Sequence, residues 1–590
     1  MFKAISKVFK SVREYKIFAI ITPLFMIGEA AVECALPFVM SLFVDSIEDA
    51  NDIKALFPYI IAIVGMAIVS ITCGILAGRF ASIASCGFAK NLRDDLYRKI
   101  ESFSFENIDH FHASSLVTRM TTDVNNTQQS FAMVIRIVIR APLMLIFSAV
   151  MAFVTGGNMA WIFVGAIPII ATIFFILARF AMGIFRRVFK RYDALNESVQ
   201  ENVAGMRVVK SFVREDYEDN KFSTASNNLS KDFIKAEKIV ALMTPMMNTS
   251  IHVVYLLTMY FAASIIFKTA GYDGENFVWG ELSLGQMSAL LTYGIQILMS
   301  IMMISMIVTM LVMSFESIRR ISEVLNEEPT IVNPENPVMN IDDGSVVFNN
   351  VSFKYKKEAE RYSVSNLNIN IKSGQFVGII GSTGSGKSTL VNLISRLYDT
   401  TEGQVLVGGK DVKEYDLKTL RDSVAVVLQK NFLFSGTIAS NMRWGNKEAT
   451  DEQIMNAINI AQIPEVISSS PDGLNRVVEQ GGANFSGGQK QRLCIARALL
   501  KKPKILILDD STSAVDTKTD KLIRKALKED LPNMTKIVIA QRISSIEDAD
   551  QIVVMNDGRI DAVGTHEELI KNNKIYQEVY YTQNKVGGDK

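Results

Sequence analysis

The chain has 590 residues, enough for several domains of roughly 100–200 residues each. Hydrophobic residues make up 49% of it and charged residues 21%, which excludes disordered and collagen-like chains and disfavours an ordinary soluble enzyme. Basic residues number 62 and acidic residues 61, so bulk charge predicts no nucleic-acid partner, and four scattered cysteines indicate neither a disulfide framework nor a zinc site. These numbers fit a membrane protein with a soluble part.

Residues 2–12 are predicted to form an amphipathic helix, with apolar residues on one face and lysines on the other. Such a helix is typical of a segment that lies on the inner leaflet of a membrane. A mitochondrial presequence is the alternative. No cleavable signal peptide is indicated, because the apolar stretch after Lys16 is too long. The apolar face comprises Phe2, Ile5, Val8, Phe9 and Val12.

Six long apolar segments follow and are predicted to cross a membrane as helices. Residues 55–78 carry no charge and would extend roughly 36 Å as a helix, beyond a hydrocarbon core of about 30 Å. Buried helices of a large soluble protein are the alternative, but such helices rarely stay uncharged over this length. The predicted spans are 17–44, 55–78, 132–154, 159–180, 239–267 and 282–315, in a transmembrane domain of residues 1–325.

Charges between the spans predict the orientation of this domain. The first 16 residues and the long segments after the second and fourth spans are rich in lysine and arginine. The segments 45–52 and 268–281 are acidic instead. Because basic segments stay on the cytoplasmic side, both termini and everything after the sixth span are expected in the cytoplasm, with the helices in the cell inner (plasma) membrane.

Residues 326–345 predict a polar linker that contains prolines, and the pattern of the chain changes after it. From residue 346 to residue 590, strand-like runs alternate with helical ones, which indicates an α/β domain on a largely parallel sheet. The expected strands include 346–348, 376–380, 505–508, 536–540 and 551–555.

A phosphate-binding loop lies between the strand pattern at 376–380 and the helical pattern that follows, which is the context that such a loop requires. Its glycines let backbone N–H groups curl around phosphate oxygens, and the helix N-terminus adds a partial positive charge. Lys387 is expected to reach the β- and γ-phosphates of ATP, and Ser388 to ligate Mg²⁺. The predicted loop residues are Gly381, Ser382, Thr383, Gly384, Ser385, Gly386, Lys387, Ser388 and Thr389.

Two further motifs accompany this loop. The apolar strand 505–508 runs into Asp509, whose carboxylate suits coordination of Mg²⁺. Upstream, a Ser-Gly-Gly sequence at the start of a helical pattern provides a second concavity for an anion. This second motif consists of Phe485, Ser486, Gly487, Gly488 and Gln489.

In this order the motifs resemble those of the ATP-binding cassette exporters, and the resemblance covers essentially the whole chain. Residues 485–489 are similar to the family's signature motif, with Phe485 in place of the commoner leucine. The resemblance implies that Tyr355 stacks on adenine and that Gln429 senses Mg²⁺. It implies a type I exporter fold, with an all-α transmembrane domain of six long helices followed by an α/β P-loop nucleotide-binding domain.

Six spans before one nucleotide-binding domain resemble a half-transporter. The resemblance implies that two halves combine and hold ATP between the phosphate loop of one subunit and the signature of the other. It also implies that residues 107–123 and 201–212 form cytoplasmic loops that dock on nucleotide-binding domains.

Two positions depart from the family pattern. The family carries a catalytic glutamate after Asp509, where this chain has Asp510, and a switch histidine where this chain has Gln541. An aspartate carboxylate would sit about 1.5 Å short, and general-base catalysis is sensitive to such a displacement. Both departures predict a site that binds ATP but hydrolyses it slowly, and hence a heterodimer whose partner half-transporter carries the glutamate and the histidine.

Glu29 and Glu33 lie inside the first span and share one helix face. Ionisable groups in a span are costly and usually face a cavity or a partner, so both are candidates for contact with a cationic substrate. Pairing with another subunit and burial in protonated form are the alternatives. Helix rise places Glu29 about 20 Å and Arg140 roughly 8 Å above the inner surface, which predicts no direct pair between them.

The function predicted from these patterns is ATP-driven export of hydrophobic or amphipathic compounds, as in multidrug efflux, by a protein that contacts membrane lipid and a small-molecule substrate. Methionines in the fifth and sixth spans offer flexible walls for varied ligands, or they fill packing positions. A lipid flippase or peptide exporter is the first alternative. An ATP-gated regulatory or channel-like subunit is the second.

Overall fold

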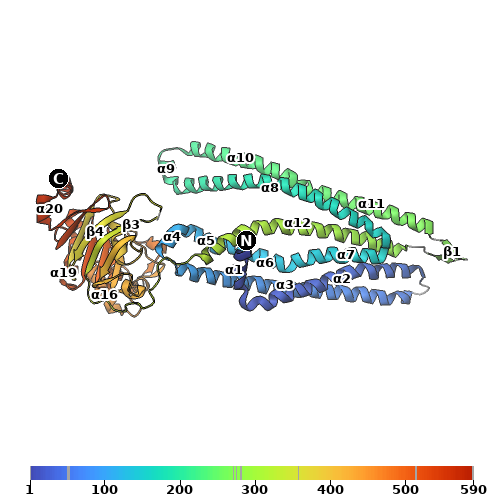
Figure 1. Ribbon diagram of the computed structural model, residues 1–590, viewed down its shortest axis with the longest axis horizontal. Coiled ribbons are helices and arrows are strands. Elements are labelled where there is room, and N and C mark those ends of the chain that lie inside the picture. The colour runs from blue at the N-terminus through green and yellow to red at the C-terminus, as the bar shows by residue number, and fades with distance from the viewer. Residues whose placement is uncertain are drawn as a thin grey trace. The chain divides into compact units, whose positions relative to one another are not determined.

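The computed structural model describes residues 2–49, 53–269, 271–273, 276–278, 282–356, 358–511 and 514–587. The chain divides into two compact units, of which the first holds residues 1–101 and 114–327 and the second holds residues 102–113 and 328–590. The first unit is helical and the second is mixed α/β (Figure 1), as predicted. Glu275 and Glu281 of the acidic segment 268–281 lie outside the described residues.

Long helices build the first unit, because its apolar segments have no partner for their backbone groups in a bilayer except their own helix. Its helices are α1 (Phe2–Phe9), α2 (Lys16–Asp49), α3 (Phe57–Glu101), α5 (Ala113–Thr118), α6 (Val124–Met133), α7 (Ile139–Gly156), α8 (Trp161–Ala204), α9 (Met206–Ser211), α10 (Glu215–Ala241), α11 (Met243–Thr269) and α12 (Leu284–Asn326). Two π-helical turns, Arg119–Asp123 and Val134–Val138, flank α6, and strands β1 (Gly271–Asp273) and β2 (Asn276–Val278) precede α12.

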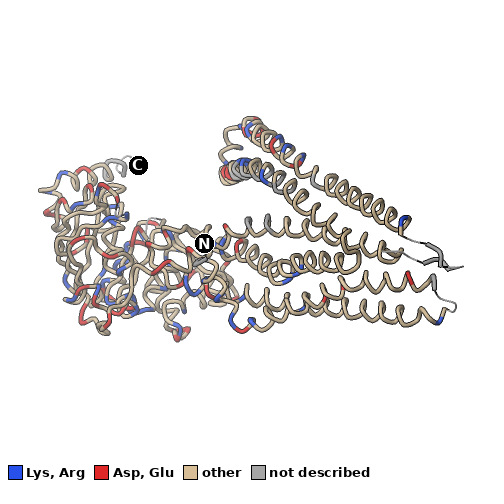
Figure 2. Tube along the Cα trace, turned by 45° about the vertical axis from the view of Figure 1, so that its right-hand side comes forward, with Lys and Arg blue, Asp and Glu red and all other residues tan. Residues whose placement is uncertain are grey.

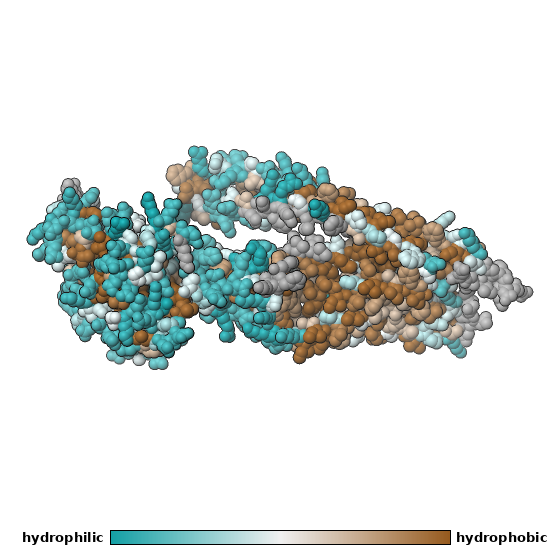
Figure 3. All heavy atoms as spheres, in the orientation of Figure 1, coloured by the Kyte–Doolittle hydropathy of each residue, from teal (hydrophilic) through white to brown (hydrophobic). Residues whose placement is uncertain are grey.

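Five helical stretches of the described chain are long and apolar enough to cross a membrane: Ile5–Ile47, Ile53–Glu101, Ala113–Ile173, Glu215–Thr269 and Leu284–Ile307. The third stretch contains the predicted span 132–154 and part of the predicted span 159–180. Gly157, at φ 49°, ends α7 and separates the two. Charged residues are sparse along these helices and gather where α8, α9 and α10 meet (Figure 2), and the helices carry a hydrophobic band (Figure 3).

The amino-terminal segment packs part of its predicted apolar face against the other helices of this unit. Val8 and Val12 are buried, and the ring of Phe9 stacks on Phe88 of α3 with centroids 5.8 Å apart. Phe131 of α6 meets the same ring edge-on at 5.5 Å. The pattern predicted an amphipathic helix, but amphipathicity alone does not say whether lipid or protein covers the apolar face.

The second unit contains one mainly parallel sheet and one antiparallel sheet. The six-stranded sheet has the order β14-β13-β5-β12-β11-β8, in which only β14 is antiparallel to its neighbour. The four-stranded sheet β4-β3-β6-β7 is antiparallel throughout. The run at 346–348 therefore belongs to the antiparallel sheet, whereas the other four predicted strands lie in the mainly parallel sheet.

The strands of the second unit are β3 (Val346–Phe353), β4 (Val364–Ile371), β5 (Phe376–Gly381), β6 (Glu402–Val407), β7 (Lys410–Asp411), β8 (Val424–Val427), β9 (Gly436–Thr437), β10 (Val477–Val478), β11 (Ile505–Asp509), β12 (Thr535–Ile539), β13 (Gln551–Asn556) and β14 (Arg559–Gly564). Its helices are α4 (Phe105–Phe111), α13 (Lys387–Ile394), α14 (Leu417–Ser423), α15 (Ile438–Met442), α16 (Asp451–Ile460), α17 (Glu465–Ser468), α18 (Gly487–Leu499), α19 (Thr517–Glu529), α20 (His566–Asn572) and α21 (Lys574–Gly587).

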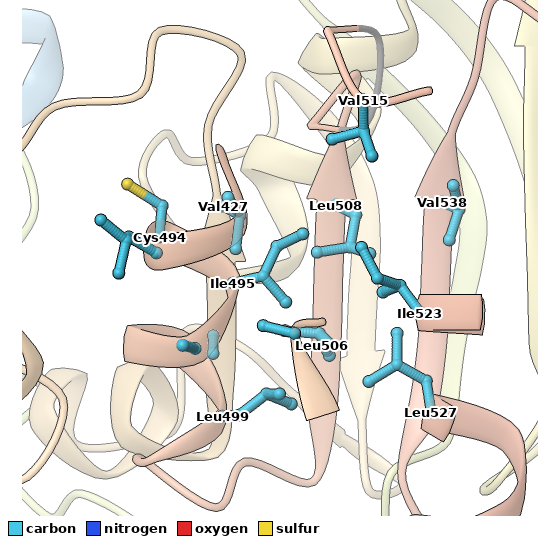
Figure 4. Packing of buried hydrophobic residues seen from close by; sticks show 14 of the residues in the cluster. Val427, Cys494, Ile495, Leu499, Leu506, Leu508, Val515, Ile523, Leu527 and Val538 are labelled. Atoms are coloured by element: carbon cyan, nitrogen blue, oxygen red, sulfur yellow. The ribbon is translucent and has the colours of Figure 1, made fainter. Parts of the chain in front are cut away.

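Both faces of the parallel sheet are buried, which explains why its strands are apolar without alternation. Along β11, Leu506 and Leu508 point into one core cluster, while Ile505 and Ile507 point into the other. Figure 4 shows the first cluster, where α18 and α19 cover the sheet. Because β5, β12 and β11 are parallel, the carboxyl ends of β5 and β11 lie at the same edge of the sheet with β12 between them, and those ends carry the phosphate loop and Asp509.

Candidate functional site

The phosphate loop follows β5 and leads into α13, as the sequence predicted. Gly386 has φ 92°, and a Cβ there would lie 2.5 Å from the side chain of Val364. A Cβ on Gly381 would lie 2.2 Å from the backbone oxygen of Met555. These positions therefore require glycine, which leaves the N–H groups at the start of α13 exposed to an anion.

Lys387, the first residue of α13, turns back over this loop. Its ammonium donates to the backbone oxygen of Gly381 at 2.9 Å and to that of Ser382 at 2.7 Å. Burial lowers the pKa of Lys387, and the nearby carboxylates of Asp509 and Asp510 counteract that shift. The cation is thus held at the loop where phosphate oxygens would lie.

Asp509 and Ser388 meet at this loop, as expected for a pair of Mg²⁺ ligands. Asp509 is 5% exposed, and burial raises its pKa, while a hydrogen bond from Ser388 lowers it. A buried carboxylate beside a hydroxyl is a donor set that suits Mg²⁺. The residues present therefore fit the metal that a nucleotide would bring.

Gln429, Asp510 and Gln541 form a hydrogen-bonded cluster. The amide of Gln541 donates to Oδ2 of Asp510 at 2.8 Å, and the amide of Gln429 donates to the same oxygen at 3.4 Å. Asp510 is 9% exposed, and burial raises its pKa although both amides lower it. The two positions that depart from the exporter pattern therefore contact each other directly.

Tyr355 lies beside a cavity of about 540 Å³ above the phosphate loop. Its hydroxyl is 3.0 Å from Oγ1 of Thr389, and its ring meets those of Phe353 and Tyr398 edge-on at 4.8 and 5.1 Å. The described residues that line this cavity are Tyr355, Arg361, Tyr362, Ser363, Gly384, Gly386, Lys387, Ser388, Thr389, Asp557 and Gly558. Sequence reasoning missed Arg361, Tyr362 and Asp557, because no local pattern marks them.

The signature residues lie at the start of α18 and do not line that cavity. Ser486 caps the helix: its Oγ accepts from the N–H of Gln489 at 3.3 Å, and the Gln489 side chain accepts from the N–H of Ser486 at 3.0 Å. Phe485 is buried in the core, with the guanidinium of Arg476 over its ring at 4.9 Å. A Cβ on Gly488 would lie 2.8 Å from the backbone oxygen of Ala514. Gly487 lies beside the same residue, but a Cβ there would be 3.5 Å from the Cβ of Ala514, an ordinary contact, so close packing requires glycine only at Gly488.

Residues 102–113, which overlap the predicted loop 107–123, contain α4 and belong to the same compact unit as the phosphate loop. Tyr398 donates its hydroxyl to Oδ2 of Asp109 at 2.6 Å, and its ring meets Phe105 edge-on at 6.2 Å. Burial and this hydrogen bond both raise the pKa of Tyr398, which keeps the hydroxyl protonated. Ser104, which caps α4, also contacts Thr330 through its hydroxyl at 2.6 Å.

Glu29 and Glu33 both pair with Arg140, although the depths estimated from helix rise predicted no pair between Glu29 and Arg140. The guanidinium of Arg140 lies 2.6 Å from Glu33 and 3.4 Å from Glu29. The estimate was wrong because it compared depths along helix axes, assumed straight spans normal to the membrane, and neglected the reach of two long side chains. The backbone oxygen of Glu33 also accepts from the amide of Gln296 on α12 at 3.3 Å.

Comparisons with known proteins agree with this architecture. Residues 19–302 match the ABC transporter transmembrane region, and residues 364–513 match the ABC transporter domain. The ABC transporter ATP-binding protein YfiB of Bacillus subtilis is 32% identical over 577 residues, which are 98% of each chain. The ATP-dependent lipid A-core flippase of Desulfotalea psychrophila is 30% identical over 585 residues, which are 98% of this chain and 99% of that one.

The fold has a solved counterpart as well. The structure of a bacterial Atm1-family ABC exporter with ATP bound matches with a TM-score of 0.80 at 22% identity, over 97% of this chain and 98% of that chain. The family matches, the full-length relatives and the shared fold lead to one conclusion. This chain belongs to the ABC transporter family, and it is an ABC exporter with a transmembrane domain followed by an ATP-binding domain.

Proposed function

We propose that this chain is one half of a heterodimeric exporter of hydrophobic or amphipathic compounds, with one slow and one active ATP site. The observation that carries the proposal is the contact between Gln541 and Asp510. Two amides hold the carboxylate that occupies the base position, and neither amide can take up a proton as a histidine would. Both features favour binding of ATP over its hydrolysis at this chain's own phosphate loop.

The binding residues are complete in this proposal. Tyr355 would stack on the base, the loop at 381–389 would surround the phosphates, and Ser388, Gln429 and Asp509 would hold Mg²⁺. Bound ATP supplies the anhydride bond whose hydrolysis drives transport. The intact signature at 485–489 would complete the partner's site, where a glutamate and a histidine carry out hydrolysis. Closure of the two ATP-binding domains on ATP would open the transmembrane domain outward.

A second candidate substrate class is lipid. The relative from Desulfotalea psychrophila carries the name of a lipid A-core flippase, and it matches this chain over nearly its full length. The exporter then flips a lipid in the inner membrane rather than expelling drugs. The two candidate functions share the same ATP chemistry and differ in the compound that the transmembrane domain carries.

The partner can be tested by purifying the tagged chain from its native membrane. A second half-transporter carrying glutamate and histidine at the matching positions is expected to come with it. In that complex, Asp510→Asn should change ATPase activity only mildly, whereas Ser486→Arg should nearly abolish it. A homodimer with robust, Asp510-dependent hydrolysis would overturn the proposal. Stimulation of the reconstituted ATPase by drugs, lipids or peptides then identifies the substrate class.

A further inference from the structure

The carboxyl-terminal helix α21 holds the backbone of the loop that carries Gln541. The side-chain amide of Gln583 donates to the backbone oxygen of Gln541 at 2.8 Å. Its side-chain oxygen accepts from the backbone N–H of Ile543 at 2.9 Å. One side chain therefore binds two backbone groups of this loop, residues 541–543.

Helix α21 is itself anchored on the core of the ATP-binding domain. Tyr576 is fully buried, and its hydroxyl lies 2.7 Å from Nδ1 of His566. The N–H of Tyr576 donates to the side chain of Asn573 at 2.8 Å, which in turn donates to Asp561 at 2.6 Å. Gln583 follows about two helical turns later, so its position is set by the core rather than by the loop it holds.

The loop 541–543 contacts the nucleotide site through Gln541. Gln541 accepts from Gln583 through its backbone oxygen and donates to Asp510 through its side-chain amide. We propose that Gln583 is a positioning residue, which fixes the loop 541–543 so that Gln541 stays on Asp510 and nucleotide is retained. This inference rests on the proposed slow ATP site. It adds that the carboxyl-terminal helix α21 restrains the loop 541–543 of that site.

A neighbouring glutamine on the same helix provides a matched control. Gln577 also makes two hydrogen bonds with its amide, but to the backbone oxygens of Ile570 and Lys571 at 2.8 and 3.1 Å, at the end of α20. Gln577→Ala therefore removes the same chemical group without touching the loop 541–543. Gln583→Ala removes the two bonds to the loop.

The direct test is amide hydrogen exchange of the full-length chain, purified with the partner that accompanies it, in the presence of ATP and Mg²⁺. Loss of two hydrogen bonds is expected to speed exchange across 541–546 about tenfold in Gln583→Ala and not in Gln577→Ala. Equal exchange in both variants would overturn the proposal, because α21 would then act through packing alone.

The second readout is retention of nucleotide on this chain, measured by photo-cross-linking of 8-azido-ATP after washing. Gln583→Ala is expected to shorten retention several-fold, whereas Gln577→Ala leaves it unchanged. Faster exchange with unchanged retention would overturn the positioning role. Fast hydrolysis at both ATP sites would instead overturn the slow-site proposal, and it would leave the exchange result standing.

Discussion

The guanidinium of Arg140 on α7 lies 2.6 Å from Oε2 of Glu33 on α2, within helices that are apolar enough to cross a membrane. Glu29 lies 3.4 Å from the same group, so two carboxylates share one cation. The contact joins two helices through charge in a region where an unpaired ion is costly.

Arg140→Gln is expected to destabilise the protein by about 2–3 kcal/mol, because it leaves two carboxylates facing each other with no cation, and partial exposure reduces the effect below that of a fully buried pair. Adding Glu29→Gln and Glu33→Gln to this variant should restore most of the loss, since no charge then remains unpaired. Thermal unfolding of the purified complex measures both changes. A triple variant no more stable than the single one would contradict the pairing.

The shared cation also leaves one net negative charge if both glutamates are ionised. Glu29→Gln removes that charge and keeps the closer pair of Glu33 with Arg140. We expect this variant to export cationic compounds less well than neutral ones of similar size, with basal ATPase near normal. Transport into inside-out vesicles provides the measurement. Equal losses for cationic and neutral compounds would rule out a substrate role.

Tyr398 is expected to connect the nucleotide site to α4. Tyr398→Phe keeps the ring beside Tyr355 but removes the hydrogen bond to Asp109, and loss of a bond to a charged group should reduce substrate-stimulated ATPase about tenfold. ATP affinity should stay unchanged. Tyr362→Phe is the control, because Tyr362 lines the cavity beside Tyr355 and donates to Glu402 instead of Asp109. Similar ATPase in both variants would argue against this connection.

Binding of Mg²⁺ should be sensitive to acid. Burial raises the pKa of Asp509, so its carboxyl keeps a proton at a higher pH than an ordinary aspartate, which titrates near 4. Because that proton competes with the metal, Mg²⁺-dependent ATP affinity should fall as the pH is lowered through a range that begins above the pKa of an ordinary aspartate.

Titrations of ATP binding with and without Mg²⁺ measure this effect. Asp509→Asn serves as the control, since its binding should gain little from Mg²⁺ at any pH in the range. If the Mg²⁺-dependent ATP affinity stays constant as the pH falls to about 4, the pKa of an ordinary aspartate, the result would contradict a raised pKa of Asp509.

Local patterns were enough to predict the phosphate loop and the helix after it. An apolar strand, glycines at fixed offsets and a helical run all act over short distances, and β5, the loop and α13 follow in that order. The prediction of a helical domain before an α/β domain was confirmed for the same reason, because hydrophobic period and length are local properties.

Contacts between distant segments escaped prediction. Tyr398 and Asp109 are 289 residues apart, and Gln583 reaches a loop 42 residues upstream, so no periodicity or motif connects them. Arg140 was predicted not to pair with Glu29, yet the two lie 3.4 Å apart, because depth along a helix axis does not give the positions of long side chains. The antiparallel pairing of β3 was missed because a short apolar strand looks alike in either kind of sheet.

The ring of Tyr355 is held by two aromatic neighbours and by its hydroxyl contact with Thr389. A base that stacks on it would therefore cost little further side-chain ordering. Stacking recognises the flat face of any purine and reads none of its edges. The proposed stacking therefore predicts weak selectivity among nucleobases: GTP should bind at this position nearly as well as ATP, with the phosphates deciding affinity.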